Sequence, residues 1–83
     1  MSEKMPVVSG KTLIRFLESI GYEITRQRGS HVRLVKSTMA GNHKITIPNH
    51  NPVAKGTLSD ILSKVSLWCQ IDKQHLVAKL KEF

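Results

Sequence analysis

The segment from Tyr22 to Ile47 alternates apolar and polar side chains along three short stretches that turn-forming residues separate. In the second stretch, Val32 and Leu34 alternate with basic or titratable neighbours. Successive side chains of a strand point to opposite faces, so each stretch would have one apolar and one polar face. The pattern predicts three strands of an antiparallel meander, over residues 22–27, 31–36 and 43–47.

Turn-forming residues delimit these strands. Gly29 and Ser30 end the first strand, and the stretch from Ser37 to Asn42 is rich in turn formers. The stretch from Pro48 to Pro52 cannot continue a regular sheet, because its prolines lack the N–H donor. It therefore predicts a loop after the third strand.

Apolar residues at helical spacing flank the strands on both sides. Ser9 suits the N-cap of a first helix over about residues 10–20, and the glycine that follows suits a left-handed position at its end. Thr57 with Asp60 resembles a capping box at the start of a second helix. Asp72 suits the N-cap of a short third helix.

The order α-β-β-β-α-α predicts an α+β fold with the helices on one face of a small antiparallel sheet, so that the other face is left open. The 83 residues contain no internal repeat and no long linker, so we expect a single domain over residues 1–83. No apolar run reaches the ~18–20 residues of a membrane span, and the start of the chain lacks the apolar stretch of a signal peptide. The one cysteine, Cys69, cannot form an internal disulfide and is expected to be a small buried side chain in a turn, which favours the cytoplasm.

The charge of the chain predicts a polyanionic partner. Thirteen Lys and Arg residues oppose six Asp and Glu residues, for a net charge of +7. No acidic residue lies between Glu23 and Asp60, where six basic residues fall: Arg26, Arg28, Arg33, Lys36, Lys44 and Lys55. Such a patch favours salt-dependent binding to nucleic acid phosphates, with an ordinary solvated surface as the alternative. Aromatic residues are few, and Trp68 is expected to be a core or interface anchor, so base stacking is not predicted.

Four histidines are the only side chains that exchange protons near pH 7 without special tuning. His31 follows a Gly-Ser turn and shares a strand face with Arg33, and a base beside cations is what metal-free RNA cleavage needs. An ordinary surface histidine is the alternative. For His43 and His50, three roles remain open: a second proton carrier, a phosphate contact or a structural role. His75 is expected at the surface. The histidine spacing matches no metal site, and no nucleotide-binding or redox motif is present.

Several of these residues occur together in a known order. Gly29-Ser30-His31 follows the strand that ends at Arg28, and Ile45-Thr-Ile-Pro48, His50 and Gly56-Thr57-Leu58 follow downstream. This combination, over about Val8 to Leu80, resembles the HicA (YcfA-like) mRNA interferase family of prokaryotic toxins.

The resemblance implies a double-stranded-RNA-binding-domain-like fold. It also implies the toxin of a type II toxin-antitoxin system, a metal-independent endoribonuclease that cleaves mRNA without a cofactor and is neutralised by a HicB-type antitoxin. His31 would then be the catalytic residue, Gly29 and Ser30 would shape the turn that presents it, and His50 would take the family's second histidine position. From charge and strand face, we further expect four basic residues to contact the substrate: Arg26, Arg28, Arg33 and Lys44.

Two other functions remain compatible with the sequence. A non-catalytic RNA-binding module could use the same basic face, because double-stranded RNA can be bound by shape and phosphate contacts alone. A DNA-binding accessory protein is less favoured, since neither the helix at Thr57 nor the one at Asp72 carries the basic residues of a recognition helix.

Overall fold

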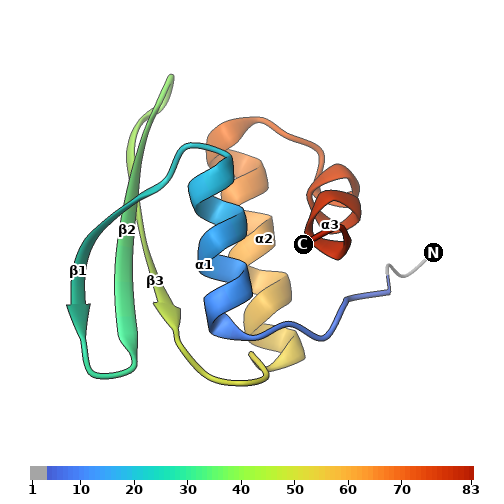
Figure 1. The fold of residues 1–83 in the computed structure, drawn as a ribbon. Coiled ribbons are helices and arrows are strands. Elements are labelled where there is room, and N and C mark those ends of the chain that lie inside the picture. The colour runs from blue at the N-terminus through green and yellow to red at the C-terminus, as the bar shows by residue number, and fades with distance from the viewer. Residues whose placement is uncertain (1–3) are drawn as a thin grey trace.

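A computed structural model describes residues 4–83, which form a three-stranded sheet and three helices. The elements are α1 (Gly10–Ser19), β1 (Glu23–Arg28), β2 (His31–Thr38), β3 (Gly41–Pro48), α2 (Lys55–Cys69) and α3 (Lys73–Lys81). The strands pair in chain order as an antiparallel meander, and the helices lie on one side of the sheet (Figure 1). The predicted α+β fold is confirmed, and the order α1-β1-β2-β3-α2 is that of the double-stranded-RNA-binding-domain-like fold, with α3 added.

The second hairpin is longer than the sequence predicted. β2 and β3 pair without interruption from His31 opposite Pro48 to Thr38 opposite Gly41. The predicted turn-rich stretch thus contracts to two linking residues, Met39 and Ala40. The Thr38 hydroxyl donates to the carbonyl of Gly41 over 2.6 Å and accepts from the amide of Ala40 over 3.1 Å, so a turn-forming side chain stabilises the end of the ladder.

An irregularity in β1 changes which face its side chains occupy. Ile24 pairs with Leu34 and Arg26 pairs with Arg33, so Thr25 has no partner of its own and forms a bulge. Regular alternation along residues 22–27 would place Arg26 on the same face as Ile24, and here it fails. Because of the bulge, Ile24 shares the helix-facing side with Leu34, whereas Arg26 shares the open face with Arg33.

The predicted ends of α1 are confirmed to within one residue. The Ser9 hydroxyl accepts the amide of Thr12 over 3.1 Å and caps the first turn. Gly21 follows the helix with φ of 109°, a conformation that side chains disfavour. These two residues determine where α1 begins and ends.

The start of α2 differs from the prediction. The helix begins at Lys55 with Ala54 as its N-cap, and no side chain caps it. Thr57 therefore lies inside the first turn and does not form the predicted capping box. For α3 the prediction is confirmed, because the Asp72 carboxylate accepts the amide of Gln74 over 3.3 Å.

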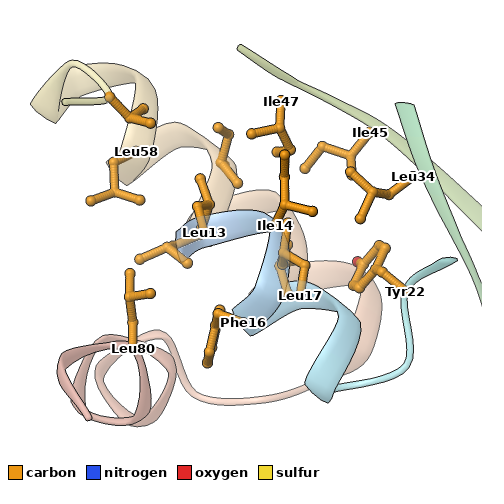
Figure 2. Packing of buried hydrophobic residues seen from close by; sticks show 14 of the residues in the cluster. Leu13, Ile14, Phe16, Leu17, Tyr22, Leu34, Ile45, Ile47, Leu58 and Leu80 are labelled. Atoms are coloured by element: carbon orange, nitrogen blue, oxygen red, sulfur yellow. The ribbon is translucent and has the colours of Figure 1, made fainter. Parts of the chain in front are cut away.

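The core lies between the sheet and the helices, with α1 at its centre (Figure 2). Ile45 and Ile47 of β3 pack from the sheet side, and Phe16 of α1 points toward Leu80 of α3 (Figure 2). The Phe83 ring contacts Phe16 edge to face, with centroids 5.5 Å apart. All helices therefore pack on one side, and the outer face of the sheet carries mostly polar side chains.

Candidate functional site

The hairpin between β1 and β2 presents His31 at the end of the sheet. Arg28 and His31 form its last pair, so Gly29 and Ser30 alone make the turn. Gly29 has φ of 58°, and a positive φ at only the first of two loop residues is the pattern of a type II′ turn. A Cβ at Gly29 would meet no atom within 4 Å, so the backbone conformation, not space, requires glycine there.

Side chains from all three strands meet on the open face beside this turn. Arg26 lies opposite Arg33, which in turn lies opposite Thr46, and Arg28 lies opposite His31. Paired residues of neighbouring strands share a face and approach closely. Together these five residues line a pocket of about 260 Å³, which we call the cation pocket: Arg26, Arg28, His31, Arg33 and Thr46.

The charge of the cation pocket is uncompensated. Between residues 4 and 83, the only ion pair joins Lys64 to Asp60 within α2, with 3.1 Å between Nζ and Oδ2. The three guanidinium groups of the pocket therefore face solvent without a carboxylate partner. A guanidinium presents a planar fork of donors that matches phosphate oxygens, so this arrangement can hold a phosphodiester beside the His31 imidazole.

The remaining expected substrate contacts lie outside the cation pocket. Lys44 is exposed on the same open face but pairs with Val35, further along the sheet. His50 is exposed in the loop after β3 and contributes backbone contacts. Lys36 turns to the helix side, where its Nζ donates to the carbonyl of Ile20 over 2.6 Å. The basic residues of the sheet are thus divided between its two faces.

Thr46 is a pocket residue that the sequence did not single out. Alternation placed its side chain on the outer face, and the structure confirms that orientation. A threonine carries neither charge nor a titratable group, so only the pairing with Arg33 shows that it lines the pocket.

Backbone hydrogen bonds fix the turn before His31 to the rest of the molecule. The amide of Asn49 donates to the carbonyl of Ser30 over 2.6 Å, and the amide of Gly10 donates to the carbonyl of His50 over 2.7 Å. The N-terminal ends of α1 and α2 lie at the same end of the molecule as the Gly29–Ser30 turn (Figure 1). Helix N-termini carry partial positive charge, so they add to the positive potential at this end.

His43 occupies the other face of the sheet. It is only 5% exposed, its Nδ1 lies 2.7 Å from the Tyr22 hydroxyl, and its ring stacks on Trp68 with centroids 4.9 Å apart. The possibilities of a second proton carrier or a phosphate contact are therefore wrong for His43, because it is buried on the helix side of the sheet, away from the open face. Cys69 packs beside this cluster as the last residue of α2 and not in a turn, with its Sγ 3.6 Å from the Tyr22 hydroxyl.

Burial determines the protonation of this cluster. It raises the pKa of Tyr22, so the phenol keeps its proton, and its hydroxyl shares a hydrogen bond with Nδ1 of His43. Burial, and then the positive charge of Lys64, lower the pKa of His43, so its imidazole is neutral in the folded protein. Both groups are thus satisfied as neutral hydrogen-bond partners in the core.

The free energy of unfolding should therefore fall as the pH drops below the ordinary histidine pKa of about 6.5. Below that pH the unfolded chain binds a proton at His43 that the folded chain resists, because its folded pKa is lowered. This group contributes at most about 1.4 kcal/mol per pH unit. Urea denaturation at pH 7.5 and 5.5 measures the difference. His43→Gln should reduce it, and an unchanged difference would contradict this assignment.

Between residues 4 and 83, no three His, Cys, Asp or Glu side chains are grouped as metal ligands would be. None of the helices described combines the length and the apolar character that crossing a bilayer requires.

Comparison with known proteins supplies the family. No curated protein and no solved structure matches the chain. The family model described as the HicA toxin of bacterial toxin-antitoxin systems matches residues 10–67, which extend from the first residue of α1 into α2 and include the whole sheet. The matched segment thus contains the Gly29–Ser30 turn and every residue of the cation pocket, and the chain belongs to the HicA toxin family.

Proposed function

We propose that this protein is a toxin that acts as a metal-independent endoribonuclease on mRNA, with His31 as its catalytic residue. The observation that carries the proposal is the convergence of one imidazole and three unpaired guanidinium groups in a single pocket on the open face. Membership in a toxin family supports the biological role, and the uncompensated charge supports a polyanionic substrate. The cytoplasm, where mRNA is found, is the proposed place of action.

In the proposed mechanism, His31 removes the proton from a ribose 2′-hydroxyl. The 2′ oxygen attacks the adjacent phosphorus in line, the bond to the 5′ oxygen breaks, and the products are a 2′,3′-cyclic phosphate and a 5′-hydroxyl end. The leaving 5′ oxygen takes its proton from water, since the other residues of the pocket are three arginines and a threonine. Arg26, Arg28 and Arg33 stabilise the negative charge that builds on the phosphorus centre.

The surrounding residues have supporting roles in this proposal. Gly29 and Ser30 hold the turn that presents His31, and Lys44 contacts a phosphate further along the open face. His50 supports the site through its backbone, which binds the start of α1.

The proposal extends to the neutralisation of the toxin by its partner. A toxin of this family works with an antitoxin, and we propose that the antitoxin is of the HicB type and covers the open face of the sheet. Its contacting surface should be acidic, because it must approach three guanidinium groups that no carboxylate of residues 4–83 neutralises.

Incubation of the purified chain with a long single-stranded RNA in excess EDTA tests the activity. We expect the full-length RNA to disappear, since the proposed chemistry uses only a base and cations of the chain. Raising the salt concentration should slow cleavage by weakening phosphate binding. Intact RNA that is nevertheless retarded on a native gel would contradict the proposal and indicate a non-catalytic RNA-binding module.

A further inference from the structure

A second pocket lies on the other side of the β1–β2 hairpin, between the hairpin and α1. Its volume is about 210 Å³, and we call it the α1–β1 pocket. Three apolar side chains, one each from α1, β1 and β2, form part of its lining: Ile14, Ile24 and Val32. The cation pocket and the α1–β1 pocket thus lie on opposite faces of the same two strands.

The edge position of β1 explains why apolar surface is open here. Ile24 faces the helix side because it pairs with Leu34, and the bulge at Thr25 brings Gln27 to the same side, but no residue of this edge strand is buried. Ile24 remains 45% exposed, although it faces the side on which the helices pack. An exposed apolar side chain in the lining of a pocket favours an apolar ligand surface.

Polar groups around this apolar surface can form hydrogen bonds to the edge of a planar ligand. The amide side chains of Gln27 and Asn49 line the pocket, and each carries two N–H donors and one carbonyl acceptor. Lys11 and Arg15 stand one turn apart on α1 and bring two positive charges, with Glu18 as the one acidic residue of the lining. Neither cation forms an ion pair within residues 4–83.

The β1–β2 hairpin separates the two pockets, and residues adjacent in the chain line one or the other. Along β1, Gln27 lines the α1–β1 pocket, while its neighbours Arg26 and Arg28 line the cation pocket. Asn49 lines the α1–β1 pocket, and its amide binds the carbonyl of Ser30, the residue before His31. A strand of RNA with a phosphate at His31 can therefore pass around the exposed edge of β1 to reach the second pocket.

We propose that the α1–β1 pocket binds one unstacked base of single-stranded RNA, next to the nucleotide that is cut, and selects among the four bases. Its volume is below the roughly 300–1,000 Å³ of pockets for drug-sized ligands, which fits a single ring system. Proteins recognise single-stranded RNA by hydrogen bonds to the edges of splayed bases, which the two amides can make. The inference rests on the proposed function, which places the cleaved phosphate of the RNA at His31. The binding of a base rests on the lining of the α1–β1 pocket.

Titration of the isotope-labelled His31→Ala variant with short oligoribonucleotides tests this inference by NMR, because RNA stays intact when the proposed base is missing. Four oligonucleotides of the same length, each with one base type, are compared. We expect the signals of Ile24, Gln27 and Asn49 to shift together with those of Arg26 and Arg33. One base type should bind at least about fivefold more tightly than the least favoured.

Gln27→Leu, combined with His31→Ala, removes the amide and keeps the approximate size of the side chain. It should abolish most of the difference among the four bases, whereas Gln74→Leu, an exposed glutamine in α3, should leave that difference unchanged. Shifts restricted to the open face, or a base preference that survives Gln27→Leu, would overturn the inference. Neither result depends on catalysis, so failure of the wild-type chain to cut RNA would overturn the proposed function alone.

Discussion

Replacing His31 with alanine is expected to lower the rate of RNA cleavage by at least about 100-fold, because general base catalysis contributes about 10²–10⁴-fold. The other residues of the cation pocket are three arginines, which carry no acceptor, and one threonine, so none is expected to substitute as the base. The fold should be unaffected, since His31 is exposed and such substitutions change the free energy of unfolding by about 0.5 kcal/mol or less. Binding should also persist, because the three arginines remain.

His75→Ala is the matched control, because it removes an exposed histidine in α3, away from the pocket. Initial rates of cleavage of one fluorescent RNA, with native circular dichroism for each variant, compare the three proteins. A His31→Ala variant that cuts at the wild-type rate would show that the base lies elsewhere.

The largest expected loss of stability from a small substitution is that of Gly10→Ala. A Cβ at Gly10 would lie 2.6 Å from both the Cα of Asn49 and the carbonyl oxygen of Pro48, which are backbone atoms that cannot move aside locally. Overpacking of this kind costs about 1–3 kcal/mol. We expect a loss of about 3 kcal/mol, because the substitution would also disturb the hydrogen bond from the Gly10 amide to the carbonyl of His50.

That loss is large for a chain of 83 residues, whose total free energy of unfolding is about 4–12 kcal/mol at typical values per residue. Gly56→Ala is the control, since Gly56 also lies in the first turn of a helix but a Cβ there meets no atom within 4 Å. It should be neutral or stabilising by up to about 1 kcal/mol. Equal urea midpoints for Gly10→Ala and the wild type would mean that the loop moves freely, contrary to this account.

The sequence predicted the elements well where periodicity and end signals agreed. Ser9 and Asp72 cap the helices they were expected to cap, because their side chains satisfy local amides and need no distant partner. The predicted start of α2 was wrong. Thr57 and Asp60 match the local pattern of a capping box, but the helix already begins at Lys55. A local capping pattern therefore predicts the start of a helix only when the residues before it are not themselves helical.

The candidate site was predictable only in part. The Gly-Ser turn, His31 and Arg33 follow from turn chemistry and simple alternation in β2, which is regular. Simple alternation gives the wrong face for Arg26. The bulge at Thr25 depends on the register with β2, and the sequence of β1 alone does not indicate it. Asn49 and the α1–β1 pocket were not foreseen, since they depend on how the loop after β3 packs against α1.

The central claim is that His31 activates a ribose hydroxyl, and the ends of the RNA fragments test it most directly. Fragments made by the wild-type chain in EDTA should carry a 2′,3′-cyclic phosphate, or the 3′-phosphate that its hydrolysis yields, together with a 5′-hydroxyl. Mass spectrometry of a short cleaved oligonucleotide distinguishes these ends. Fragments that carry a 3′-hydroxyl and a 5′-phosphate would show that water attacks the phosphorus instead, and would contradict the mechanism.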